Sequence, residues 1–333
     1  MQSHTGTGSA QAPVPFQISS VACKDGCTHV ARSYRNHLGI GVKQRYALSY
    51  RIFRPNAISS QEYPPLVVIH GGMGLPSDYL LPLVDNIPYR CVIMYDQLGC
   101  GRSESPNDIN AYSIGDSVND LKTLLDSLRV TKYHLYAHSA GTCIAFEYLK
   151  LIHLPVHAEK QQRHCCLSAI FSSGSFNIQL AKQLADDMEA KVTNQLMVEY
   201  GKVDPAQLAE RIRTTCICRT PSMPVQLKAA YSKAGTVWKG LEVIQDYVAE
   251  CLLDSSTDTD STDNSILLPP MMLLRGEYDF ISEELAFQGW RNVLCAHAQD
   301  LKCSTMEGCS HMPMLEDPSN HGRIVNAFYN QCD

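Results

Sequence analysis

The stretch HLYAHSAG at residues 134–141, in which a serine stands among small residues, is the part of the sequence most indicative of the fold. Residues 134–137 are typical of a short buried strand, and the apolar run 142–151 is typical of a helix packed on a sheet. A serine at such a junction forms a nucleophile elbow, a turn so tight that the residues two before and two after it must be small. Ala137 and Gly141 satisfy this requirement, with Ala137 where Gly is more common.

An elbow would turn the Ser139 hydroxyl into the crevice above a sheet and place the N-terminus of the following helix beneath it. The Ala140 amide would then be able to donate to an oxyanion. A second interpretation is that Ser139 only caps the helix that begins at Thr142, as serines commonly do. So short a motif is weakly specific, and the choice depends on the rest of the chain.

Strand and helix patterns alternate on both sides of this stretch, which predicts a doubly wound, mostly parallel α/β sheet. Helical patterns cover residues 114–128 and 324–329. Strand patterns cover residues 44–55, 66–69, 91–95, 166–171, 271–274 and 301–306.

The alternation predicts four segments. Residues 1–20 are rich in Ser, Thr, Gly, Gln and Pro and are predicted to be a flexible tail. Residues 21–174 and 265–333 are the two parts of the α/β core. Residues 175–264 are predicted to be a helical cap, inserted after the fourth core strand and ending in an acidic Ser/Thr/Asp loop.

Two later loops supply partners for Ser139. Asp279 follows the strand pattern 271–274, and His311 follows the strand pattern 301–306. The order serine, acid, histidine is the order that the α/β-hydrolase fold requires. Glu277 is an alternative acid, because it lies nearer the end of its strand.

A glycine-rich loop, HGGMG at residues 70–74, follows the strand pattern 66–69. Glycine lets the backbone approach a substrate closely, so we predict that the Gly72 amide is the second oxyanion donor. His70, Gly71 and Met73 are predicted to border the substrate pocket, and His70 is expected to hydrogen-bond backbone near this loop. The loop lacks the Lys-Ser/Thr that follows the glycines of a nucleotide-binding loop.

Composition excludes several classes of protein. Among 333 residues, 44% are hydrophobic and the formal net charge is −6, without the basic stripe of a nucleic-acid binder. No apolar run is long enough for a membrane span, and the first twenty residues do not resemble a secretory signal, which predicts a cytoplasmic protein. Its 14 cysteines are then expected to be free thiols. Cys23, Cys27 and His29 are close in sequence, but no second pair at zinc-finger spacing accompanies them, so we predict no metal and no cofactor.

With these motifs the chain resembles the prolyl iminopeptidase family of α/β-hydrolases. The resemblance rests on HGGMG with Tyr79-Leu80, YDQLGCGRS at residues 95–103, the Ser139 elbow, GEYD at 276–279 and SHMP at 310–313. It implies a triad of Ser139, Asp279 and His311, with Gly72 and Ala140 as oxyanion donors and without a cofactor. It also implies release of an N-terminal residue, often proline, from short peptides.

The amine-binding pocket of that family is less clear in this sequence. In relatives a Glu can follow the catalytic Asp, whereas Phe280 stands there in this chain. Glu242, Asp246 and Glu250 are the candidate carboxylates of the cap, although each is also typical of a solvated helix residue. The sequence therefore predicts a serine hydrolase acting on a short peptide or small molecule. The alternatives are an esterase, amidase or lactonase of a natural product, as in fungal secondary metabolism, and a non-catalytic ligand-binding protein.

Overall fold

The structure, a computed structural model, describes residues 21–55, 63–72, 74–153, 164–237, 244–251, 268–294 and 300–333. The predicted tail, Met73, Glu242 and the acidic loop of the cap lie outside the described residues. In the part of the chain that is described, no helix is long and apolar enough to cross a membrane.

An eight-stranded sheet forms the centre of the described structure, with the strand order β1-β2-β4-β3-β5-β6-β7-β8. The six strands from β3 to β8 pair in parallel, whereas β1 and β2 are antiparallel additions at one edge. The doubly wound, mostly parallel sheet predicted from the sequence is therefore confirmed. The strands are β1 (Val21–Arg35), β2 (Gly41–Pro55), β3 (Leu66–Ile69), β4 (Val92–Tyr95), β5 (Lys132–His138), β6 (Cys165–Ser172), β7 (Met271–Gly276) and β8 (Leu301–Met306).

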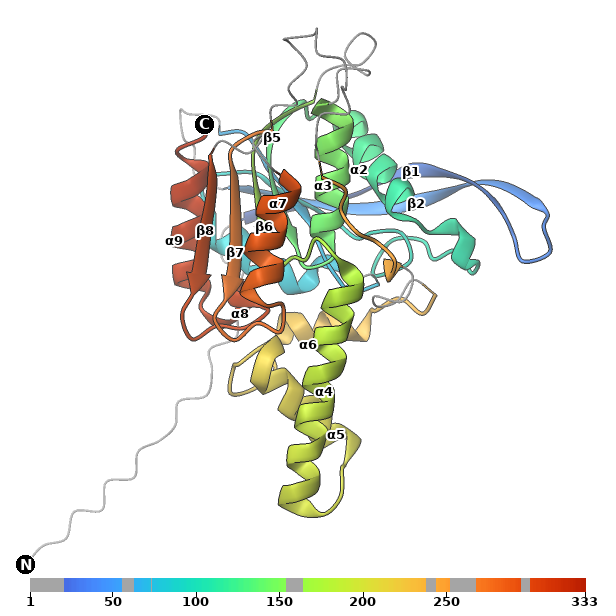
Figure 1. Ribbon diagram of the computed structural model, residues 1–333. Helices are drawn as coiled ribbons and strands as arrows, with labels where there is room; N and C mark the ends of the chain where they lie inside the picture. The colour runs from blue at the N-terminus through green and yellow to red at the C-terminus, as the bar shows by residue number, and fades with distance from the viewer. Residues whose placement is uncertain are drawn as a thin grey trace, which may run out of the picture.

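Strand β1 is an element that the sequence patterns did not predict. It pairs with β2 along its whole length, from Val21 opposite Pro55 to Arg35 opposite Gly41, and the hairpin extends beyond the sheet (Figure 1). Most of its side chains are exposed, so the sequence carries no apolar alternation to mark it. An extended strand also separates Cys23 from Cys27 by about 13 Å, too far for both thiolates to bind one zinc ion. Among the described residues, no group of three or more His, Cys, Asp or Glu side chains could hold a metal.

Helices cover both faces of the sheet. On one face lie α2 (Ile114–Leu128), α3 (Gly141–His153) and α7 (Trp290–Leu294), which follows the π-helical turn η6 (Glu284–Gly289). On the other lie α1 (Pro82–Asn86), α8 (Pro313–Glu316) and α9 (Pro318–Tyr329), with the short 3-10 helix η1 (Ser77–Leu80). Helix α2 has the predicted bounds, because the Ser113 side chain caps its first turn and Arg129 ends it in the left-handed conformation.

The cap elements follow β6, the strand after which the sequence predicts them. They are α4 (Ile178–Tyr200), α5 (Pro205–Ile212), the π-helical turn η4 (Arg213–Ile217) and α6 (Val225–Ser232). Helices α4 and α5 project away from the sheet beyond the carboxyl ends of its parallel strands, while α6 lies closer to the core (Figure 1). The Asn177 side chain caps α4 at its start, and Gly201 ends it at a φ of 68°.

Candidate active site

Ser139 lies in a sharp turn between β5 and α3, at a φ of 53° in the left-handed region. A non-glycine residue adopts this conformation only at a cost, and such strain concentrates at functional sites. The turn is held because the Ser139 amide donates to the Ser172 carbonyl at 2.8 Å and the Ser139 carbonyl accepts from the Thr142 amide at 3.0 Å. The Ser139 hydroxyl contacts Nε2 of His311, so it does not serve as the cap of α3.

Two glycines allow the elbow and the glycine-rich loop to meet backbone to backbone. A Cβ on Gly71 would lie 2.6 Å from the Ser139 Cβ and 2.5 Å from the His138 carbonyl oxygen. A Cβ on Gly141 would lie 2.6 Å from the His70 carbonyl oxygen. Contacts this short are not available to any residue with a side chain, so glycine is required at both positions.

His311 joins Ser139 to Asp279. The Nε2 atom of His311 is 3.0 Å from the Ser139 Oγ, and its Nδ1 atom is 2.8 Å from Oδ1 of Asp279. His311 and Asp279 are buried, and Oδ1 of Asp279 also accepts from the Ile281 amide at 2.9 Å. An ionised carboxylate only accepts hydrogen bonds, so the proton of the neutral imidazole lies on Nδ1 and the Nε2 lone pair faces the serine.

The alternative acid, Glu277, does not contact His311. Its side chain is exposed, and its Oε2 accepts from the Gly308 amide at 2.9 Å. The structure therefore brings Asp279 to the imidazole and places Glu277 at the surface of the same loop.

The backbone amides of Gly72 and Ala140 are the two predicted oxyanion donors. Within the described residues, neither the Gly72 nor the Ala140 amide has a hydrogen-bond acceptor. The Gly71 amide, by contrast, donates to the Tyr79 hydroxyl at 2.8 Å. Gly72 has a φ of 62°, a conformation that glycine adopts without strain. The loop therefore leaves one amide free next to the elbow, as an oxyanion hole requires.

His70 holds the glycine-rich loop rather than facing a substrate. It is completely buried, its Nε2 accepts from the Gln97 amide at 2.8 Å, and its Nδ1 donates to the Gly71 carbonyl at 3.0 Å. Burial lowers the pKa of His70, which keeps the imidazole neutral and able to make both bonds. The backbone hydrogen bonds expected of His70 near the oxyanion loop are therefore present, and its buried ring does not face a pocket.

His138 connects the same loop to His311. Its Nδ1 is 2.9 Å from the Tyr79 hydroxyl, and its Nε2 donates to the His311 carbonyl at 2.8 Å. Burial, and then the neighbouring His311, hold the pKa of His138 well below its usual value, so it is neutral at physiological pH. The sequence places His138 next to Ser139, but nothing in it shows that Tyr79 and His311 lie on either side of this ring.

The remaining predicted pocket residues divide into two groups. The Phe280 ring is half-buried and lies 4.6 Å from the His311 ring, between centroids, so it borders the site. Asp246 and Glu250 are exposed, and no described polar contact joins them to Ser139 or His311. Met73 and Glu242 lie outside the described residues.

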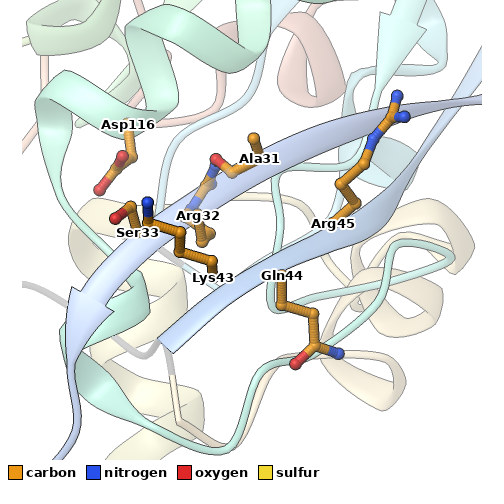
Figure 2. A pocket seen from close by; sticks show the side chains of 7 residues that line it. All are labelled: Ala31, Arg32, Ser33, Lys43, Gln44, Arg45 and Asp116. Atoms are coloured by element: carbon orange, nitrogen blue, oxygen red, sulfur yellow. The ribbon is translucent and has the colours of Figure 1, made fainter. Parts of the chain in front are cut away.

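A hollow elsewhere on the surface is separate from these residues. It has a volume of about 520 Å³ and lies between the β1–β2 hairpin and α2 (Figure 2). None of the predicted site residues borders it. It is lined by Ala31, Arg32, Ser33, Lys43, Gln44, Arg45 and Asp116.

Comparison with known proteins shows which family the chain belongs to. A family model described as the alpha/beta hydrolase fold matches residues 64–212. A proline iminopeptidase of Lactobacillus acidophilus is 39% identical over 296 residues, which are 86% of this chain and 96% of that protein. The chain belongs to the proline iminopeptidase family of α/β-hydrolases. A more distant proline iminopeptidase, from Saccharolobus solfataricus, is 22% identical over 93% of this chain and 96% of its own.

Solved structures agree with the fold of this family. The proline iminopeptidase of Mycobacterium smegmatis has a TM-score of 0.66 at 17% identity, covering 90% of this chain and 98% of its own. A thermophilic esterase from Thermogutta terrifontis has a TM-score of 0.56 at 15% identity, covering 92% and 99%. At these identities the likeness shows the fold alone. Membership of the proline iminopeptidase family makes this chain a hydrolase. Its fold is shared by a peptidase and an esterase of known structure.

Proposed function

We propose that this protein is a serine hydrolase that cleaves an amide or ester bond through an acyl-enzyme, with Ser139, His311 and Asp279 as its triad. The observation that carries the proposal is the continuous contact from the Ser139 Oγ through both nitrogens of His311 to Asp279. This arrangement makes a nucleophile, a base and a group that orients the base.

In the proposed first step, the Ser139 Oγ attacks a carbonyl carbon while Nε2 of His311 accepts the hydroxyl proton. The Gly72 and Ala140 amides donate to the resulting oxyanion. His311 then gives the proton to the leaving amine or alcohol, and the acyl group remains on Ser139. Water then attacks the acyl-enzyme with His311 again as base. The bond from the carbonyl carbon to the Ser139 Oγ breaks as His311 returns the proton to this oxygen, and the carboxylic acid leaves. The ionised Asp279 stabilises the imidazolium in each step.

A fluorophosphonate probe followed by a substrate panel tests this proposal. The probe is expected to label Ser139, identified by mass spectrometry of the modified peptide, because it reacts with an activated serine. Aminoacyl amides and short-chain esters would then be compared by kcat/KM. An unlabelled Ser139 in folded protein would support the alternative of a non-catalytic binding protein.

The family relationship favours an aminopeptidase, whereas Phe280 favours a substrate without a free amine. Phe280 packs against His311 at the position where relatives can carry a Glu. A buried ammonium needs a paired carboxylate, so a phenylalanine at this position supports an amide, ester or lactone of a small molecule as the second candidate.

Acetylation of a substrate's amino group distinguishes the two candidates. We expect it to lower kcat/KM by less than about tenfold, equal to roughly 1.4 kcal/mol, because an apolar or neutral group beside Phe280 costs little to bury. The measurement compares matched free and acetylated aminoacyl amides. If proline amides are the best substrates and acetylation abolishes their cleavage, the pocket holds an amine anchor, with Glu242, Asp246 and Glu250 the first residues to substitute.

A further inference from the structure

Several hydrogen-bond donors of the loop that carries His311 bind one carboxylate, that of Glu316 in α8. The Ser310 amide donates to Oε2 of Glu316 at 2.9 Å, and the Met312 amide donates to Oε1 at 3.1 Å. The Ser310 hydroxyl donates to the same carboxylate at 3.0 Å. The residues before and after His311 are thus fixed to a single side chain.

The cap reaches the same carboxylate. The Arg219 amide, just beyond η4, donates to Oε2 of Glu316 at 3.0 Å. The neighbouring Cys216 carbonyl accepts from the His311 amide itself at 3.2 Å. The Arg219 guanidinium also lies 3.9 Å from the centre of the Tyr278 ring, one residue before Asp279. The inner edge of the cap therefore contacts the loops of both the base and the acid.

The donors around Glu316 match what a carboxylate can accept. Its two oxygens offer about four lone-pair sites, and four donors surround them: the Ser310 amide and hydroxyl, the Met312 amide and the Arg219 amide. Hydrogen bonds to an ionised acceptor are stronger than neutral ones. A glutamine of the same shape would offer one oxygen only and would turn its own N–H groups toward some of these donors.

From this geometry we infer that Glu316 is a positioning residue for His311, and that it links the placement of the imidazole to the docking of the cap segment 216–219. The inference rests on the proposed triad. His311 must be held within a few tenths of an ångström of both partners, and a misplacement of about 1 Å can lower the rate by about a hundredfold. Glu316 fixes the backbone on each side of the imidazole, while its carboxylate has no described contact with Ser139 or Asp279.

The test compares Glu316→Gln with Glu307→Gln, an exposed glutamate of the turn after β8. We expect Glu316→Gln to slow fluorophosphonate labelling of Ser139 by at least about tenfold and to lower kcat with KM within about twofold. The downfield proton resonance of the His311 Nδ1–H should shift or broaden. Glu307→Gln should match the parent in all three measurements. Thermal unfolding of each variant shows whether it is folded.

Arg219 tests the cap connection and serves as the second arm if Glu316→Gln does not fold. Arg219→Ala keeps the amide that donates to Glu316, whereas Arg219→Pro removes it. Cys218, the preceding residue, has φ −154° and ψ 103°, an extended conformation compatible with a following proline. We expect the fluorophosphonate probe to label Ser139 at least about threefold more slowly in Arg219→Pro than in Arg219→Ala, because the proline variant lacks one hydrogen bond to Glu316.

The outcomes separate this inference from the proposed function. If the parent protein is not labelled at Ser139, the triad itself is wrong. If the parent is labelled and folded Glu316→Gln reacts as fast as Glu307→Gln with an unchanged His311 resonance, Glu316 does not position the base. Equal labelling of the two Arg219 variants would overturn the link to the cap.

Discussion

Replacing Ser139 with alanine is expected to lower kcat by on the order of 10⁴–10⁶-fold on the best substrate of the panel. The reason is that no acyl-enzyme can form without the hydroxyl that lies 3.0 Å from His311. Only substrate binding and the free amides of Gly72 and Ala140 would remain to accelerate hydrolysis. Steady-state kinetics on purified protein, with unfolding curves for parent and variant, provide the measurement.

His311→Ala should produce a loss of similar size, and the double variant should lose little more than either single one. Groups that act as one unit are strongly non-additive in this way. Activity of folded Ser139→Ala within about tenfold of the parent would rule out Ser139 as the nucleophile. Independent, additive losses would show that serine and histidine do not act in one step.

The second large effect concerns the acid. Asp279→Asn is expected to lower kcat by about 10³–10⁴-fold, while leaving the protein folded. Asparagine can keep an oxygen where Oδ1 accepts from His311 and from the Ile281 amide, but it lacks the charge that stabilises the imidazolium. Its amide group would then occupy the position of Oδ2, a buried atom that has no hydrogen-bond partner among the described residues.

Glu277→Gln is the matched control, since it removes a carboxylate two residues away in the same loop. Its side chain bonds only the Gly308 amide among described contacts, a bond that the glutamine oxygen can retain. Its kcat should stay within about threefold of the parent, in line with a conservative change at an exposed site. The reverse ranking of the two variants would transfer the role of the acid to Glu277.

The central sheet could be predicted because several of its strands are continuous apolar runs in the sequence. β3 and β4 are buried on both faces and therefore appear as uninterrupted apolar runs, as in parallel sheets generally. Strand β1 carries no such signal, because its polar side chains face solvent and its place is set by pairing with β2. Pairing between distant segments leaves little trace in local composition.

The candidate site shows the same division. Ser139, Asp279 and His311 stand in short motifs at strand ends, so their meeting follows from the order of the strands. The role of Glu316 depends on a contact with the Arg219 amide of the cap, which lies about a hundred residues earlier in the chain. No local sequence pattern predicts a contact over such a separation. For His70, the position beside the glycines predicts a backbone hydrogen bond near the loop, but not that the Gln97 amide is one of its partners, because Gln97 belongs to a different motif.

Gly71 and Gly141, where the glycine-rich loop and the elbow pack against each other, limit the ways in which this protein can acquire a new substrate specificity. Each lies against backbone or Cβ atoms of the opposite loop, so any larger residue at one of them would have to displace both loops together. We expect a single substitution at either glycine to disturb both the proposed oxyanion donors and the proposed nucleophile. Adaptation to a different substrate is therefore confined to the cap and to residues such as Phe280, whose side chains can change while the elbow and the glycine-rich loop stay as they are.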